Sequence, residues 1–228
     1  IPNTAETSFY GMVETAEAFI NKKKTKAILT GQRSISAEKV TEILSERARV
    51  EKIAIKDVKL RTFITEDSSR DDLVAHVYDI TYGVIKPNDN LVIIDDSIVR
   101  GTTLRDSIIF SLSRLKPKKI VIVSSAPQIR YPDCYGIDMS KMREFAAFKA
   151  LVALLKDHKK EHLLQETYDR CVAEEKKPVE EMVNQVQALY NEFTYEQISD
   201  KIGEIVTPDG LDIPVKVIYQ TVEDLHKA

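Results

Sequence analysis

Two adjacent acidic residues begin the part of this sequence that is best suited to chemistry. They follow the apolar run 91–94 and open a segment of nine residues: Asp95, Asp96, Ser97, Ile98, Val99, Arg100, Gly101, Thr102 and Thr103. A carboxylate accepts two hydrogen bonds in a plane, so an adjacent pair can hold the 2′- and 3′-hydroxyls of a ribose. Gly101 lets backbone N–H groups approach an anion closely, and Thr102 and Thr103 add donors where a helix begins. We therefore expect residues 95–103 to bind both ends of a ribose 5-phosphate.

The elements around this segment must place it at the edge of a sheet. The apolar run 91–94 is typical of a parallel strand that is buried on both faces. Leucine and isoleucine then recur every three or four residues over 104–115 and predict a helix that ends before Pro117. The range 120–125 predicts a second strand. A strand, a helix and a strand at this spacing indicate a right-handed parallel crossover, and hence an open α/β sheet that binds ligands beyond the carboxyl ends of its strands.

The part of the chain before this unit predicts a mixture of helices and strands. Residues 5–22 have helical spacing and run into three lysines, where we expect the helix to end. The range 26–30 is a strand candidate, and Ser36 can cap a helix with one buried stripe. Residues 58–64 alternate weakly, as a strand would, and 65–72 are polar enough for a loop.

The part of the chain after this unit is mainly helical. Residues 141–190 predict two or three solvent-exposed helices interrupted at Pro178, 215–219 predict a last strand, and 221–228 predict a terminal helical turn. We expect a core domain over residues 1–145, a helical insertion over 146–190 and a return to the core over 191–228.

Composition limits the class of protein. The 228 residues are 43% hydrophobic and 30% charged, which suits one globular domain or two small ones. With 33 basic and 36 acidic residues the net charge is −3, so we expect neither nucleic acid nor a membrane surface as a partner. Two cysteines, Cys134 and Cys171, are too few for a disulfide framework and favour the cytoplasm. Because the chain begins with Ile1 rather than Met, we expect it to be a fragment.

Three other motifs have both a functional and an ordinary interpretation. A haloacid-dehalogenase-like nucleophile needs Asp-x-Asp after the strand, and Ser97 occupies the place of the second Asp, which excludes that reading. His158 and His162 are four residues apart and would share one face of a helix, but their charged neighbours favour a solvated face over a metal pair. The range 130–139 either contacts a substrate or shapes the wall of a pocket.

The segment 95–103 resembles the loop that binds 5-phosphoribosyl 1-pyrophosphate (PRPP) in the type I phosphoribosyltransferases. Taken with Ala126 to Met139, it is similar to one family among them, the amidophosphoribosyltransferases. Residues 1–8 are similar to that family's loop after an earlier strand, and Arg61-Thr62-Phe63-Ile64 to the start of its flexible loop. The resemblance covers about residues 1–19 and 58–145 and, loosely, 195–228.

The resemblance implies a fold, an activity and a set of roles. It implies the type I phosphoribosyltransferase fold, an open and mainly parallel twisted sheet with flanking helices, here with an added helical region. Asp95 and Asp96 would hold the ribose and, with Thr7, place Mg²⁺, while residues 100–103 would hold the 5′-phosphate and Arg61 would act from the flexible loop. In that family ammonia from a glutaminase domain displaces pyrophosphate from PRPP, the first step of purine biosynthesis. Homo-oligomers and feedback inhibition by purine nucleotides are also implied.

One departure and two alternatives remain open. The family usually places several basic residues on its closing loop, whereas this chain has Asp71 and Asp72 there and only Arg70 is basic. This predicts either a different loop closure or reduced activity. Because the chain lacks the glutaminase half, we expect it to use free ammonia at most. The alternatives are a PRPP-sensing regulator without catalysis and a phosphoribosyltransferase that acts on a base.

Overall fold

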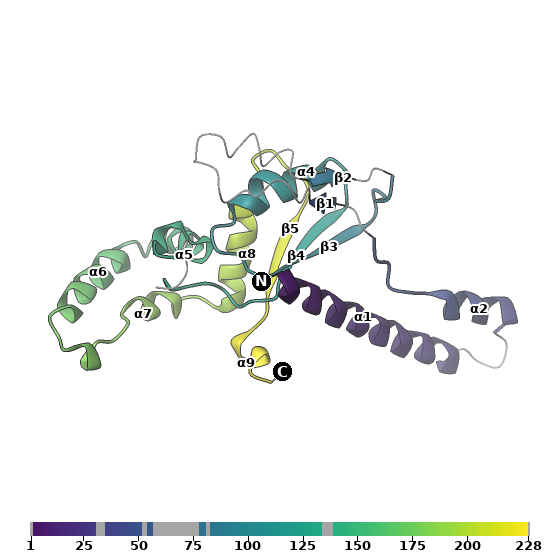
Figure 1. Ribbon diagram of the computed structural model, residues 1–228, viewed down its shortest axis with the longest axis horizontal. Coiled ribbons are helices and arrows are strands. Elements are labelled where there is room, and N and C mark those ends of the chain that lie inside the picture. The colour runs from purple at the N-terminus through teal and green to yellow at the C-terminus, as the bar shows by residue number, and fades with distance from the viewer. Residues whose placement is uncertain are drawn as a thin grey trace. The chain divides into compact units, whose positions relative to one another are not determined.

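A computed structural model describes residues 2–30, 35–51, 54–56, 78–80, 83–133 and 139–227. The chain divides into two compact units, Ile1–Ile53 and Ala54–Ala228. Each unit is described by itself, and both are drawn in Figure 1.

The described residues of the first unit contain two helices. Helix α1 spans Pro2–Thr30 and helix α2 spans Ala37–Ser45. Ser36 caps α2 as predicted, because its Oγ accepts a hydrogen bond from the N–H of Lys39 at 3.3 Å. The expected buried stripe of α2 is wrong: no residue of this helix is fully buried, and Leu44 is 50% exposed.

Helix α1 corrects three predictions about the beginning of the chain. The helix does not end at the lysine run 22–24, the range 26–30 is helical rather than a strand, and residues 2–8 are helical rather than a loop. Four apolar or β-branched residues, 27–30, cannot by themselves distinguish a strand from a helix, and the lysines and alanine in and before this range favour a helix. Lys24 is only 5% exposed and donates a hydrogen bond to the carbonyl of Leu44 at 3.3 Å, so the middle of the basic run is anchored to α2.

The described part of the second unit is built on three parallel strands. Strand β3 spans Asn90–Asp95, β4 spans Lys119–Ser124 and β5 spans Val215–Tyr219, in the order β3-β4-β5. Two short strands, β1 (Ala54–Lys56) and β2 (Tyr78–Ile80), pair antiparallel in a separate sheet. The parallel α/β fold with flanking helices predicted from the sequence is therefore confirmed.

The two faces of the parallel sheet differ in burial. Ile120 and Ile122 of β4 are fully buried, and Leu91 and Val217 share their face by register. On the other face Val92 is 48% exposed. The expectation that the run 91–94 is buried on both faces is therefore wrong, because β3 has only one buried face.

A helix connects β3 to β4 as the periodicity predicts. It consists of the π-helical stretch η2 (Leu104–Ile109) and α4 (Phe110–Ser113). Leu104, Ile109 and Leu112 are buried. Lys116 adopts a left-handed conformation with φ 51°, and the following Pro117 cannot continue a helix, so the chain turns here into β4.

The rest of the second unit is helical apart from β5. The helices are η3 (Met142–Glu144), α5 (Ala146–Asp157), α6 (His162–Glu174), η4 (Val179–Glu181), α7 (Val186–Tyr190), α8 (Tyr195–Val206) and α9 (Val222–Leu225). This agrees with the predicted helices over 141–190 and their interruption at Pro178. The expectation that these helices are solvent-exposed is wrong for α5, where six residues, Leu151 and Leu155 among them, are buried. Helix α5 packs on α8, and α8 packs along β5 (Figure 1). Gly203 allows the close approach, because a Cβ atom there would lie 3.2 Å from the carbonyl oxygen of Val215.

Within the described ranges, none of the helices is both long enough and apolar enough to cross a membrane.

Candidate functional site

The acidic pair lies where the sequence predicts it, at the carboxyl end of β3. Asp95 is the last residue of this strand, and its register partners are Ser124 in β4 and, through Ser124, Tyr219 in β5. Residues in register on parallel strands share a face, so Asp95 lies on the buried face of the sheet.

The electrostatics of the pair follow from this position. Burial, together with the negative charge of Asp96, raises the pKa of Asp95 to about 6. Its Oδ1 accepts a hydrogen bond from the N–H of Asp96 at 3.0 Å, which partly compensates the charged form. The Oδ1 of Asp96 in turn accepts from the N–H of Ser97 at 2.8 Å. An adjacent cation would relieve the repulsion between the two carboxylates.

The donor set fits Mg²⁺ in its usual binding mode. No group of three or more histidine, cysteine or acidic side chains gathers in the parts of the chain that the structure describes. Mg²⁺ is commonly held by one or two carboxylates together with oxygens of a phosphorylated substrate, so the pair Asp95 and Asp96 suffices. His158, by contrast, packs its ring on Phe193 with centroids 5.2 Å apart.

The backbone of the acidic pair is held by the next strand. The N–H of Ser125 donates to the carbonyl of Asp95 at 2.9 Å, and the Ser125 hydroxyl donates to the carbonyl of Asp96 at 3.2 Å. These bonds extend the ladder between β3 and β4 past the last strand residues. The position of both carboxylates therefore depends on where the chain runs after β4.

The middle of the segment 95–103 is anchored to the start of the helical region. Ile98 is 3% exposed, and the carbonyl of Val99 accepts a hydrogen bond from the N–H of Ala146 at 2.7 Å. Arg100 forms an ion pair with Glu144, with Nη2 and Oε2 2.8 Å apart. The arginine that the resemblance assigns to the 5′-phosphate is thus bound to a carboxylate in this structure.

Gly101 begins the helix and is required for two reasons. Its φ of 76° is in the left-handed region, and a Cβ atom would lie 2.8 Å from Cγ1 of Val206. Its carbonyl accepts the N–H of Arg105 at 3.0 Å, which closes the first helical turn. Thr102 and Thr103 are exposed on that turn, where the backbone N–H groups of a helix start favour an anion.

The acids and the glycine lie toward different ends of β5. Gly101 contacts Val206, the last residue of α8, and Gly203 of that helix lies beside residues 215–217, the first half of β5. Asp95 is in register with Tyr219, the last residue of β5. The two halves of the predicted ribose 5-phosphate site are therefore separated along the strand direction.

Several predicted site residues fall outside this description. Arg61, the closing loop with Asp71 and Asp72, and residues 134–138 lie outside the described residues. Thr7 lies in α1, in the first unit, while the acidic pair lies in the second. Their assigned roles stay predictions.

No pattern in the sequence indicates the two tyrosines that lie near this edge of the sheet, Tyr195 and Tyr219. Tyr219 is 6% exposed, and burial raises its pKa, with further contributions from Tyr195 and Asp95. The rings of Tyr195 and Tyr219 meet edge to face with centroids 6.4 Å apart. Tyr195 is a hundred residues from Asp95 in the chain, and only the fold brings it to this edge of the sheet.

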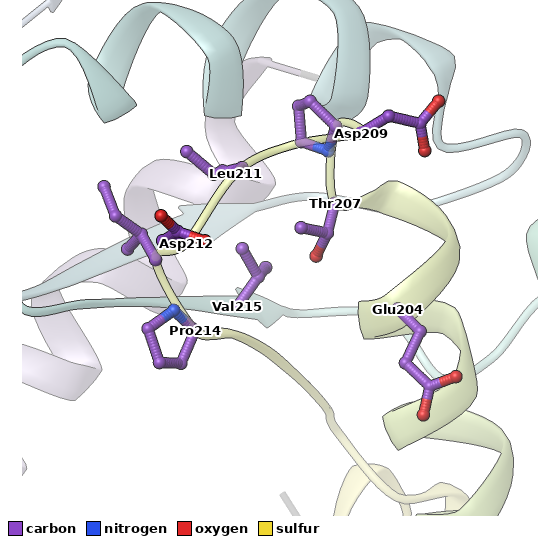
Figure 2. Close-up of a pocket in the computed structure, with 9 residues that line it drawn as sticks. Glu204, Thr207, Asp209, Leu211, Asp212, Pro214 and Val215 are labelled. Carbon is purple, nitrogen blue, oxygen red and sulfur yellow. The ribbon is translucent and has the colours of Figure 1, made fainter.

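A surface pocket lies elsewhere on the second unit. It forms where α8 ends and β5 begins and is lined by apolar residues and by the acidic Glu204, Asp209 and Asp212 (Figure 2). Asp209 forms an ion pair with Arg105 at 3.1 Å. The pocket lies at the opposite end of β5 from the position that is in register with Asp95 and has no residue of the acidic pair in its lining.

No family model matches the chain. Curated proteins match over part of it. An amidophosphoribosyltransferase of Pasteurella multocida is 48% identical over 59 residues, which are 26% of this chain and 12% of that protein. The amidophosphoribosyltransferase of Escherichia coli is 47% identical over 58 residues, 25% of this chain and 11% of that protein. The resemblance inferred from the motifs is confirmed over about a quarter of the chain, and the matched segments span about an eighth of these relatives or less.

Among solved structures, the chain is similar to the glutamine PRPP amidotransferase of B. subtilis, which was determined in complex with ADP and GMP. The two are 23% identical, the similarity covers 78% of this chain and 27% of that one, and the TM-score is 0.39. A likeness at this level supports no inference about the site.

Proposed function

We propose that this chain is the phosphoribosyltransferase part of an amidophosphoribosyltransferase. It would transfer the phosphoribosyl group of PRPP to ammonia, giving 5-phosphoribosylamine and pyrophosphate, the first step of purine biosynthesis. One observation carries the proposal: a half-buried pair of carboxylates ends a parallel strand, and the chain then leads within seven residues into a helix that begins at a left-handed glycine. The local identity to amidophosphoribosyltransferases supports this member of the class.

The acidic pair would bind the sugar. Two adjacent carboxylates can accept hydrogen bonds from both hydroxyls of a ribose, which fixes the ring relative to the sheet edge. The C1–O bond to pyrophosphate weakens before nitrogen arrives, so positive charge develops on the sugar next to Asp95 and Asp96. A preorganised negative charge in a half-buried site stabilises this developing positive charge.

Mg²⁺ would be held by the same two carboxylates and would neutralise negative charge on the leaving pyrophosphate. Thr7 is a proposed further contributor to this metal site, and Arg61 a proposed contributor from the closing loop.

The start of the crossover helix would bind the 5′-phosphate. Thr102 and Thr103 offer hydroxyls, and the first backbone N–H groups of the helix offer further donors. In this structure Gly101 lies against Val206 at the end of α8, and neither acid is among its nearest neighbours. We therefore propose that the sugar phosphate binds with residues 97–103 rearranged, so that Gly101 leaves Val206 and approaches the acidic pair.

The remaining features of the proposal concern the whole enzyme. Ammonia would come from a glutaminase domain, purine nucleotides would act as feedback inhibitors, and the enzyme would be a cytoplasmic homo-oligomer. These features rest on the similarity to amidophosphoribosyltransferases alone.

The proposal is tested by pyrophosphate release. The chain is incubated with PRPP, Mg²⁺ and a high concentration of ammonium at alkaline pH, and we expect release that depends on ammonium. Asp96→Asn is expected to lower the rate on the order of 10²-fold, because it removes negative charge beside the reacting carbon. Asp200→Asn, at an exposed position of α8, is the matched control and should leave the rate unchanged.

The outcomes separate the alternatives. Release at equal rates with and without ammonium would contradict amidotransfer. Tight binding of PRPP in calorimetry, without any release, would instead support a PRPP-sensing regulator. Failure of the wild-type chain to bind PRPP in the presence of Mg²⁺ would remove the proposed function altogether.

A further inference from the structure

The segment that follows β4 is fixed by a buried polar network that the proposed reaction does not use. Its centre is Gln128, which is 7% exposed. The Gln128 side-chain amide donates to the carbonyl of Tyr195 at 2.9 Å and to the hydroxyl of Ser199 at 2.8 Å, both on α8. Its carbonyl oxygen accepts two hydrogen bonds from Arg130, at 3.0 and 2.9 Å. The side chain of Gln128 is therefore bound on both sides.

Arg130 connects this network to the helical region. Its guanidinium lies over the ring of Tyr190 at 4.8 Å and over the ring of Tyr195 at 5.1 Å. The Tyr190 hydroxyl donates to the carbonyl of Arg130 at 3.3 Å. The orientation of the Arg130 guanidinium is fixed, because its cation–π contacts with the two rings act together with its two hydrogen bonds to Gln128. Helix α7, the end of the predicted insertion, thus holds the chain that leaves β4.

Tyr195 bridges the ends of two strands. Its hydroxyl accepts the backbone N–H of Gln128 at 2.9 Å and donates to the carbonyl of Gln220 at 3.1 Å. Gln128 follows β4 and Gln220 follows β5, so one hydroxyl fixes the distance between both strand ends. The N–H of Gln220 donates to the carbonyl of Ser124 at 3.0 Å, and Ser125 holds the backbone of Asp95 and Asp96.

Hydrogen bonds and short stretches of backbone therefore run without a gap from Tyr195 to the acidic pair. The ring of Tyr195 also packs against Tyr219, whose strand position is in register with Asp95. A half-buried hydroxyl with both a donor and an acceptor partner is costly to remove, because both partners lose a bond where water enters poorly.

We propose that Tyr195 is a positioning residue for the acidic pair: its hydroxyl joins the chain ends after β4 and β5 and so sets the backbone of Asp95 and Asp96 at the sheet edge. As a role in binding PRPP, the inference rests on the proposed function. As a role in ordering the acidic pair, it stands on the network alone.

Tyr195→Phe removes the hydroxyl and keeps the ring, and Tyr168→Phe, on the exposed face of α6, is the matched control. Amide hydrogen exchange of the whole chain is measured without ligand. We expect exchange at Asp96, Ser97 and Ser125 to rise about tenfold in Tyr195→Phe and to stay unchanged in Tyr168→Phe. Exchange at Ile93 and Ile122, inside the strands, should change much less. A purely structural role would raise exchange at all these amides in the same proportion, and that result, or no change, would overturn the proposal.

Calorimetry with PRPP and Mg²⁺ gives the second measurement. Tyr195→Phe is expected to raise the dissociation constant for PRPP about tenfold. In an Asp95→Asn background the same substitution should change this constant little, because Tyr195 acts through the acidic pair. Equal effects in both backgrounds would contradict the role in binding. If the wild-type chain does not bind PRPP, the proposed function fails, while the exchange result still decides whether Tyr195 orders the pair. If Tyr195→Phe does not fold, Arg130→Met is used in its place, because methionine keeps an unbranched side chain against the rings of Tyr190 and Tyr195. We expect the same changes in amide exchange and in PRPP binding.

Discussion

At the scale of single residues, Asp95 is the position where folding and function conflict. An acid on the buried face of a sheet, next to a second acid, loses hydration and feels a like charge, and both effects raise its pKa. Nothing in the packing of β3 requires an acid at this position. Such a residue is expected where the charge has a use, which is why the pair is the best candidate for binding a sugar and a cation.

The raised pKa predicts how stability depends on pH. The pKa of Asp95 is about 6 in the folded chain against an ordinary value of 3.8, so its proton favours the folded state. The stabilisation that protonated Asp95 gives to the folded state is complete below about pH 4 and is lost as the pH rises through 6. We expect Asp95→Asn to raise the free energy of unfolding at pH 8 by on the order of 1 to 3 kcal/mol, with a smaller gain at pH 5. Urea unfolding with a chelator present measures it, and a gain independent of pH would contradict this account.

Gly101 gives a second prediction at this scale. Gly101→Ala puts a Cβ atom on a backbone with φ 76° and against Val206, so we expect a loss of about 2 to 4 kcal/mol in the free energy of unfolding. In a Val206→Ala background the overlap disappears and about 1 to 2 kcal/mol should remain, from the left-handed conformation alone. The same loss in both backgrounds would show that Val206 is not the obstacle.

At the scale of elements, α8 organises the second unit. One of its faces packs Ile198 and Ile202 into the core against α5, and Gly203 lets the helix approach β5. Its first turn holds the segment after β4 through Tyr195, and its last residue contacts Gly101. One helix therefore contacts Gly101 directly and is linked to the acidic pair through the chain that follows β4 and β5.

The start of α8 predicts a measurable contribution. Thr194 and Gln197 form a capping box, with the threonine hydroxyl accepting the N–H of Gln197 at 3.2 Å and the glutamine side chain accepting the N–H of Thr194 at 2.8 Å. Thr194→Ala is expected to lower the free energy of unfolding by about 1 kcal/mol. Thr221→Ala, at the cap of the four-residue helix α9, is the comparison and should cost less. Denaturant unfolding distinguishes them, and an equal or larger cost at Thr221 would contradict a special role for α8.

At the scale of the whole molecule, the core belongs to the second unit. Every buried hydrophobic residue in the described part of the chain lies between Leu91 and Tyr219, while the buried residue of the first unit is Lys24. The hydrophobic stabilisation of the fold thus comes from the sheet and the helices around it.

This distribution predicts that the second unit folds without the first. We expect residues 54–228 to unfold cooperatively, with a free energy of unfolding within about 1 kcal/mol of that of the full chain. Comparison of the two urea transitions tests this. A truncated chain without a cooperative transition would show that residues 1–53 complete the core.

The amino-acid sequence by itself determined the central β-α-β unit and the chemistry at its edge. The apolar run 91–94, the 3.6-residue period over 104–115 and the acids between them are local patterns, and local patterns report local structure. The strand at 26–30 failed for the same reason, since a short apolar run fits either a helix or a strand and its neighbours decide.

Only the tertiary structure decided what surrounds the acids. Tyr195 and Gln128 lie far apart in the chain, and no periodicity links them; the packing of α8 along β5 brings them to the end of the sheet. The position of Gly101 beside Val206, away from the acidic pair, is equally non-local. A sequence motif lists the groups that can bind a ligand, whereas their separation is set by contacts between elements, and these depend on the whole fold.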